Sequence, residues 1–279
     1  MIVLLTDYGT RDPFVGMIKG VLGTIAPEIT QVDLTHGIPP GDVRRGAIVL
    51  WQALSYFPPG SVFLAVVDPG VGTWRKPILV RTGQAIFIGP DNGLFSFITQ
   101  LEYQAWEISN PEFMLPVIGA TFHGRDIFAP AAAHVAIGVP PNRLGDPIHK
   151  ITFLPPPKLA VSGPSMKGET LFSDGFGNIL TSFGKFSQLK SHGYLFEPWL
   201  SMDPSNDLLT HWTLKDAHLV LPTGEGLPWV KTFSDVPEGT CAFLVGGSGL
   251  LEVISNRASA AGLLHLSESS ALTLLTGGR

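Results

Sequence analysis

The residues best suited to chemistry lie on a glycine-rich loop, where an arginine follows an aspartate after seven positions. Asp68 ends the β-branched run 62–67, which is typical of a buried strand, and Gly70 and Gly72 separate it from Arg75. In open α/β sheets, ligands bind at the carboxyl ends of strands. A carboxylate in this position either contacts a ligand or caps its own turn beside a solvated arginine.

Other polar side chains occupy comparable places in the N-terminal part of the chain. Asp7 follows the apolar run 2–5, Asp12 lies in the next loop, and His123 precedes an alanine-rich helix expected over 127–137. The approach to a helix N-terminus favours polar or anionic ligands, although a histidine there can also bond a backbone carbonyl. We expect several of these side chains to converge with Asp68 on one crevice.

A cluster of aspartates and a histidine could bind a divalent metal, as in a phosphohydrolase. The sequence contains no His-x-His pair and no His-Glu-x-x-His, and Arg75 would compete with a cation for Asp68. It also lacks a P-loop and a Gly-x-Ser-x-Gly elbow, and Cys241 is its one cysteine, in an apolar run. Metal hydrolysis, nucleoside triphosphate binding and covalent acyl transfer are therefore disfavoured.

The N-terminal pattern predicts parallel strand–helix units. A strand over 2–5 leads to a helix with Asp12 as N-cap and Pro13 as its first residue, and a second helix starts at Asp42. The remaining expected elements are strands over 29–34 and 62–67, a hairpin of 78–81 with 85–88, and a short helix through 94–98. These elements predict an α/β domain, mostly a parallel sheet with flanking helices.

The proline run at 153–158 predicts a stiff connector and a domain boundary, giving domains 1–154 and 158–279. Beyond it, short strands between Gly/Pro turns predict a smaller β-barrel or sandwich, with strands at 158–161, 168–173, 179–182, 218–221, 229–233, 241–245, 250–254 and 272–275. Two glycine-rich turns, 174–178 and 246–249, interrupt it. Each could be only a hairpin turn, although a turn does not require the amide of Asn178 or the carboxylate of Glu252.

Composition excludes several classes of partner. The 279 residues carry a net charge of −5 without a Lys/Arg block, which disfavours nucleic acid and anionic membranes. The apolar stretch 129–139 is too short and too interrupted to span a bilayer, so no transmembrane helix is expected. The N-terminus reads as a first strand rather than a signal peptide, which predicts a cytoplasmic protein.

Five motifs resemble, in order, those of the S-adenosylmethionine (SAM) hydroxide adenosyltransferase family, relatives of the fluorinases and chlorinases. The matching segments extend from Ile2 to about Gly262 and centre on 6–12, 67–75, 89–93, 122–126 and 174–178. The resemblance implies an α/β domain followed by a β-barrel domain. It also implies hydrolysis of SAM to adenosine and methionine, without a cofactor or metal, by attack of water or hydroxide at ribose C5′.

The resemblance also implies roles for individual residues. Asp68, Arg75 and His123 would orient and polarise the water, with Arg75 keeping Asp68 ionised and His123 able to take or relay a proton. Asp7 would bind the ribose hydroxyls, Asp174 the methionine ammonium and Asn178 an adenine edge. Asp12, Ser248, Glu252, Arg257 and Ala258 would complete the substrate site. Gly246-Gly247 departs from the Asn-Ser pair common in relatives, at the methionine end.

Relatives form homotrimers in which the ligand lies between the N-terminal domain of one subunit and the C-terminal domain of the next. The same arrangement is the expectation for this chain. Three alternatives stay open at the level of sequence: a SAM-dependent halogenase, a metal-dependent phosphohydrolase, and a nucleoside-binding protein without activity. The last is favoured if Asp68, Arg75 and His123 lie too far apart to share one water.

Overall fold

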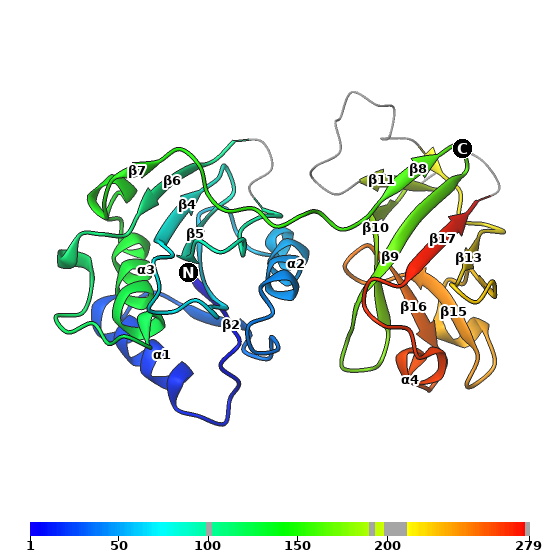
Figure 1. Ribbon diagram of the computed structural model, residues 1–279, viewed down its shortest axis with the longest axis horizontal. Helices are drawn as coiled ribbons and strands as arrows, with labels where there is room; N and C mark the ends of the chain where they lie inside the picture. Colours follow the sequence, from blue (N-terminus) through cyan, green and yellow to red (C-terminus); the bar gives the residue numbers. More distant parts are fainter. Residues whose placement is uncertain (99–101, 190–192, 198–210, 277–279) are drawn as a thin grey trace. The chain divides into compact units, whose positions relative to one another are not determined.

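The computed structural model describes residues 1–98, 102–189, 193–197 and 211–276. The chain divides into two compact units, Met1–Leu154 and Pro155–Arg279 (Figure 1). Each unit has its own sheet and its own hydrophobic core. The division falls at the proline run that follows Leu154.

The N-terminal unit is built on seven strands: β1 (Ile2–Thr6), β2 (Gln31–Thr35), β3 (Ser61–Val66), β4 (Pro77–Arg81), β5 (Ala85–Pro90), β6 (Gln104–Glu107) and β7 (Pro147–Ile148). They form one mixed sheet in the order β2-β1-β3-β5-β4-β6-β7. The first four in this order run parallel, and β4, β6 and β7 pair antiparallel. The parallel strand–helix units and the β4–β5 hairpin are therefore confirmed.

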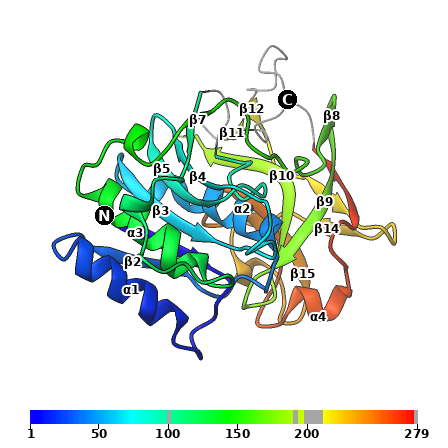
Figure 2. The ribbon, with the colours of Figure 1, turned by 60° about the vertical axis from the view of Figure 1, so that its left-hand side comes forward.

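Helices cover both faces of this sheet: α1 (Phe14–Ile25), α2 (Val43–Ala53) and α3 (Ala129–Ala136), with short helical turns η1 (Leu54–Tyr56), η2 (Pro111–Phe113), η3 (Gly124–Phe128) and η4 (Pro141–Arg143). Figures 1 and 2 show α1 and α3 together on one face and α2 on the other. Leu22 of α1 and Ala132 of α3 share a buried cluster with Ile2 and Leu4 of β1. Their burial fixes the face on which α1 and α3 pack.

The parallel pairing brings two predicted site residues to one edge of the sheet. Thr6, the last residue of β1, pairs with Val66, the last residue of β3. Asp7 and Asp68 therefore leave neighbouring strands at the same carboxyl edge. This is the edge at which α/β proteins bind ligands.

Two predictions about helix N-termini differ from the structure. Asp12 is not the N-cap of α1: Pro13 occupies that position, and its carbonyl accepts the first helical bond from Met17 N at 2.9 Å. The alanine-rich helix begins earlier than predicted, with the π-helical turn η3 at Gly124. Phe122 O already accepts bonds from the amides of Arg125 and Asp126, at 3.1 Å each, so the chain coils directly after His123.

The helix predicted over 94–98 is also wrong. This stretch forms successive turns, because the amides of Ser96 and Ile98 bond the carbonyls three residues earlier, Gly93 O and Phe95 O. The side chains that suggested a helix are buried all the same. Burial, rather than helical periodicity, explains their apolar character.

The C-terminal unit is an antiparallel, nearly closed barrel-like sheet of ten strands, with the edge strand β8 paired to β9. Its strands are β8 (Ala160–Ser162), β9 (Ser165–Ser173), β10 (Ile179–Gln188), β11 (Tyr194–Glu197), β12 (His211–Trp212), β13 (His218–Val220), β14 (Gly226–Pro228), β15 (Cys241–Val245), β16 (Leu250–Ser255) and β17 (Ala271–Leu275). β10 is central, since it pairs with β9, β11 and β16. A smaller β-rich domain is confirmed.

One predicted strand of this unit, 229–233, is wrong. The chain instead leads into the turn η5 (Phe233–Asp235), because the Asp235 carboxylate accepts bonds from Lys231 N and Thr232 N at 3.0 Å each. Those two amides are thereby withdrawn from strand pairing. A short helix, α4 (Ala260–Leu264), was not predicted; Ser259 caps it by accepting a bond from Gly262 N.

Candidate active site

Asp68, Arg75 and His123 form a continuous chain of hydrogen bonds. Arg75 Nε lies 3.1 and 3.0 Å from the two carboxylate oxygens of Asp68. Arg75 Nη2 lies 2.5 Å from Asp68 Oδ2 and 2.8 Å from His123 Nδ1. The side chains of Arg75 and Asp68 are only 8% and 5% exposed. The ion pair is thus shielded from water. Charge-assisted hydrogen bonds are stronger in such a buried environment than in water.

This geometry fixes the protonation of His123. Arginine has no acceptor atom and stays protonated, so Nδ1 of His123 accepts the bond and the ring proton lies on Nε2. Burial, and after it the charge of Arg75, lower the pKa of His123 below its usual value. His123 is therefore a neutral imidazole whose remaining N–H can donate.

Two contacts hold the loops that carry these side chains. Asn92 Nδ2 donates to the carbonyl of Val67, the residue before Asp68, at 2.8 Å. Gly72 lies against the segment leading to His123, since a Cβ on Gly72 would stand 2.6 Å from Ala120 O. Gly72 also has a φ of +77°, which favours glycine. From the sequence, Asn92 stands out only as part of the glycine-flanked turn 89–93, and no separate role for it is predicted.

Asp126 anchors the π-helical turn that begins after His123. Its side chain is fully buried and accepts bonds from Gly119 N at 2.8 Å and from Arg125 Nε at 2.6 Å. Asp126 O also accepts from Leu115 N at 2.8 Å. The aspartate of the predicted motif 122–126 therefore fixes the local backbone.

Asp7 and Asp12 have different surroundings. Asp7 is half-buried and accepts a bond from Gly41 N at 2.8 Å. Burial raises the pKa of Asp7, and the nearby charge of Asp68 adds to this effect. Asp12 is exposed and makes no hydrogen bond with the described residues. Of the two, Asp7 belongs to the electrostatic neighbourhood of Asp68.

In the C-terminal unit, Asp174 and Asn178 form one hydrogen-bonded turn. Asp174 Oδ1 accepts from the amides of Phe176 and Asn178, and Oδ2 accepts from Asn178 Nδ2, each at 2.9 Å. Asn178 is buried, whereas Phe176 is 85% exposed. The carboxylate of Asp174 thus shapes the turn. It does not bond the amide oxygen of Asn178 or contact the Phe176 ring through these bonds, so both can contact a ligand.

Glu252 lies half-buried near this turn. Burial, with a smaller contribution from the charge of Asp174, raises the pKa of Glu252 to about 7. A Cβ on Gly246 would overlap the Glu252 carboxylate. Gly246, at the predicted departure from the family pattern, thus provides the space that Glu252 occupies.

The remaining predicted residues of this unit lie at two places. Arg257 and Ala258 line a cavity of about 490 Å³ together with Phe176, Asn178, Phe233 and Ser255. Arg257 also pairs with Glu238, Nη1 to Oε1 at 2.5 Å. Ser248 is half-buried on the turn between β15 and β16. An aromatic ring beside a buried amide makes the cavity suitable for a flat heteroaromatic group.

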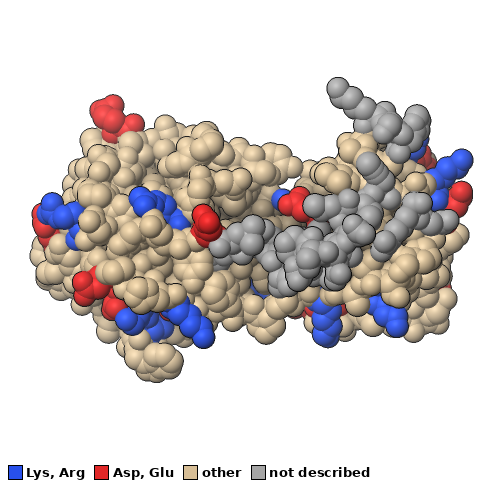
Figure 3. Space-filling model, turned by 90° about the horizontal axis from the view of Figure 1, so that it is seen from above, with Lys and Arg blue, Asp and Glu red and all other residues tan. Residues whose placement is uncertain are grey.

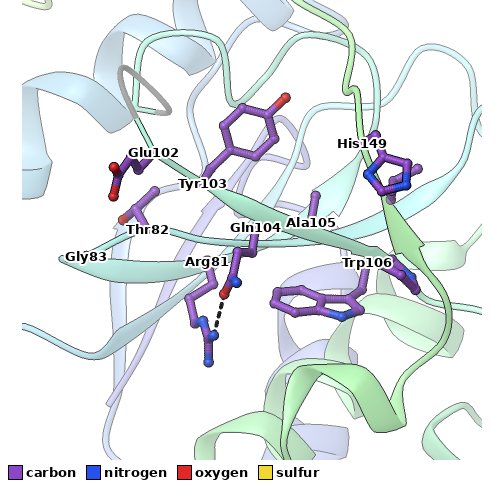
Figure 4. Close-up of a pocket in the computed structure, with 11 residues that line it drawn as sticks. Arg81, Thr82, Gly83, Glu102, Tyr103, Gln104, Ala105, Trp106 and His149 are labelled. Atoms are coloured by element: carbon purple, nitrogen blue, oxygen red, sulfur yellow. Dashed lines mark hydrogen bonds between the residues drawn. The ribbon is translucent and has the colours of Figure 1, made fainter.

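A separate cavity of about 780 Å³ lies on the N-terminal unit along β4, β6 and β7 (Figure 4). There the Arg81 guanidinium bonds Gln104 and stands 5.4 Å from the centre of the Trp106 ring. None of Asp68, Arg75 and His123 lines it.

On the face in Figure 3, basic and acidic side chains are interspersed among uncharged residues. Over the described ranges, no helix is long and apolar enough to span a bilayer. In the same part of the chain, no three His, Cys, Asp or Glu side chains are grouped to bind a metal ion.

The chain belongs to the SAM hydroxide adenosyltransferase family. The family's N-terminal domain matches residues 2–145 and its C-terminal domain matches residues 168–273. The resemblance inferred from the five motifs is thereby confirmed.

Individual relatives cover nearly the whole chain. An (R)-S-adenosyl-L-methionine hydrolase from Thermus thermophilus is 39% identical over 98% of this chain and 99% of its own length. A fluorinase from an Actinoplanes species is 27% identical over 92% and 91%. The crystal structure of an uncharacterized conserved protein from Thermotoga maritima superposes with a TM-score of 0.83 at 33% identity, over 99% of this chain and all of that one.

Proposed function

We propose that this protein hydrolyses S-adenosyl-L-methionine to adenosine and L-methionine by attack of water at ribose C5′. The observation that carries the proposal is the hydrogen-bonded set Asp68–Arg75–His123 at the carboxyl edge of the parallel strands. The hydrolase relative, which is similar over the full length, supports the same reaction.

The leaving group of this reaction needs no activation by the protein. The C5′–S bond breaks with its electron pair going to sulfur, and methionine leaves as a neutral thioether without a general acid. The difficulty is the nucleophile, because water is weak until a proton is withdrawn. We assign Asp68 as the acceptor of that proton, since Arg75 donates to both of its carboxylate oxygens and fixes the group in place.

His123 acts through Arg75 in this proposal. Its Nδ1 already accepts from Arg75 Nη2, so taking a further proton there would break the contact and place two cations side by side. The lowered pKa of His123 agrees with a neutral role. His123 holds the guanidinium against Asp68 and is not the base.

The substrate contacts are proposed from the family resemblance, and the geometry of the two units agrees with them. Asp7, beside Asp68, binds the ribose hydroxyls, and Asn178 with the cavity lined by Arg257 and Ala258 binds the adenine. We assign Asp174, Glu252 and Ser248 to the methionine end of the substrate. Asp12, exposed in its loop, is the weakest member of the proposed set.

Three alternatives have less support. A metal-dependent phosphohydrolase would need the oxygens of Asp68, to which Arg75 donates. A binding protein without activity would be favoured if Asp68, Arg75 and His123 lay too far apart to share one water. Instead, Arg75 is within hydrogen-bond distance of both Asp68 and His123. Halogenation is disfavoured because the fluorinase is more distant than the hydrolase. A homotrimer with ligand between subunits and a cytoplasmic location both stay predictions.

The test is incubation of chelator-treated protein with SAM in ¹⁸O-labelled water, followed by mass spectrometry. Adenosine labelled at its 5′ oxygen, beside unlabelled methionine, is the expected result. An Asp68→Ala variant should slow turnover at least about tenfold, equivalent to about 1.4 kcal/mol of barrier, while still binding adenosine. Intact SAM, or 5′-halo-adenosine formed only with added halide, would contradict the proposal.

A further inference from the structure

The hydroxyl of Tyr8 occupies a defined place beside the candidate active site. Tyr8 follows Asp7 at the carboxyl edge of the sheet, and its hydroxyl lies against Gly124, the residue after His123. A Cβ on Gly124 would overlap this hydroxyl oxygen and stand 3.3 Å from two ring carbons of Tyr8. Glycine at 124 therefore makes room for the hydroxyl.

The ring that carries the hydroxyl is held by other aromatic rings. Phe14 and Phe122 pack edge-on against Tyr8, with centroids at 6.0 and 5.9 Å, and against each other at 5.3 Å. Such edge-to-face contacts restrict a ring in position and orientation. The hydroxyl is thus fixed from two sides, by Phe14 at the start of α1 and by Phe122 next to His123.

The hydroxyl lacks a hydrogen-bond partner among the described residues. The charges of Asp7, Asp68 and Arg75 act on the ionisation of the hydroxyl, and Tyr8 is half-buried. Burial and the two carboxylates raise the pKa of Tyr8 well above its usual value, so the group keeps its proton. A half-buried phenol without a partner has a hydrogen bond to offer to a bound molecule.

We propose that the Tyr8 hydroxyl is a further catalytic residue, which donates a hydrogen bond to the water that attacks C5′. This inference rests on the proposed hydrolase function. It assigns the water a position between Tyr8 and Asp68, two groups that do not bond each other directly.

In this arrangement each part of the water has one task. One lone pair accepts from the Tyr8 hydroxyl, one hydrogen bonds Asp68, and the second lone pair points at C5′. As the new O–C5′ bond forms, the C5′–S electrons leave with methionine and the water proton passes to Asp68. Tyr8 keeps its own proton throughout and lowers the barrier by orientation.

The test is Tyr8→Phe in the full-length protein, with kcat and KM for SAM measured beside the melting temperature. We expect kcat to fall about tenfold or more, with KM within about twofold, since orientation of water matters only in the chemical step. The melting temperature should stay near that of the unmodified protein, because the phenylalanine ring keeps the aromatic contacts. Tyr56→Phe, which changes a tyrosine that is 68% exposed, is the matched control.

A double-mutant cycle with Gly124 gives a second, independent readout. Gly124→Ala should lower kcat by displacing the hydroxyl, whereas adding Gly124→Ala to Tyr8→Phe should lower it little further. Equal effects of Gly124→Ala in both backgrounds would overturn the inference, as would wild-type kcat in Tyr8→Phe. If Gly124→Ala does not fold, Tyr8→Phe decides alone. Absence of SAM hydrolysis by the unmodified protein would instead overturn the proposed function.

Discussion

At the scale of single residues, the arginine does more than neutralise a carboxylate. Arg75 contacts Asp68 and His123 at once, and its guanidinium carbon stands 5.4 Å from the centre of the buried Phe128 ring. A lysine could not make the same forked contacts, because it presents a single charged nitrogen. The ionisation of the histidine is therefore coupled to the arginine.

Replacing Arg75 by glutamine should raise the pKa of His123. The positive charge of Arg75 lowers this pKa, and removing the charge leaves burial opposed by the carboxylates of Asp68 and Asp126. NMR titration of the imidazole signals measures the change. His134 is the internal control, since its pKa is lowered by burial and raised only by Glu112. An unchanged His123 pKa would contradict the assigned contact.

Glu252→Gln should stabilise the protein at alkaline pH and have little effect at pH 5. The pKa of Glu252 is raised from 4.5 to about 7, so the folded state favours the protonated form. The stabilisation from this proton is present below the unfolded pKa and lost as pH rises through 7. Thermal melts between pH 5 and 8.5 test this, with the exposed Glu268→Gln as control. A constant difference in melting temperature would contradict it.

At the scale of elements, turns rather than helices aim the side chains of the site. Asn92, in the turn after β5, donates to the carbonyl of Val67, which lies between the end of β3 and Asp68. Asp126 ties the turn after His123 to Gly119. Such side-chain bonds to backbone explain why loops hold functional groups in fixed positions.

Asn92→Ala should cost about 1–3 kcal/mol of unfolding free energy and also lower kcat, because the carbonyl of Val67 loses its partner and Asp68 loses its support. Asn110→Ala is the matched control. Its amide also donates to a carbonyl, that of Arg143 at 2.9 Å, and accepts from the amide two residues on. Urea denaturation and kcat should separate the two variants. If Asn92→Ala and Asn110→Ala lowered kcat equally, the assigned role of Asn92 in supporting Asp68 would be contradicted.

At the scale of the whole molecule, the candidate groups are divided between two compact units. The Asp68, Arg75 and His123 set belongs to Met1–Leu154, and the turn of Asp174 and Asn178 belongs to Pro155–Arg279. The proposed homotrimer would combine one such half from each of two subunits. This gives a test that needs no structure of the assembly.

Asp68→Ala and Asn178→Ala subunits, each with lowered activity alone, should regain activity when refolded together. In a cyclic trimer with sites between subunits, about a quarter of the sites in an equal mixture would hold both intact halves. Light scattering should give three times the chain mass of 29.9 kDa. No recovered activity, or a monomeric mass, would contradict the arrangement.

The family, the parallel strand–helix units, the smaller β-rich domain and the candidates Asp68, Arg75 and His123 can all be predicted from the order of the amino acids. The elements follow from local periodicity, and the family and the candidate residues follow from motifs whose order along the chain can be recognised without knowing the fold. The predictions were wrong for the strand over 229–233, for the cap of α1 and for a helix over 94–98. In the last two cases the reason is local. There, proline geometry and three-residue turns override patterns that burial alone can produce.

How these groups contact one another becomes known only from the folded structure. The neutral state of His123 depends on which nitrogen faces Arg75, a residue distant in sequence. The space that Gly246 leaves for Glu252, and Gly124 for Tyr8, becomes visible only when the packed neighbours are known. The physical reason is that protonation and close packing depend on distances between segments far apart along the chain, and a local pattern carries no such distances.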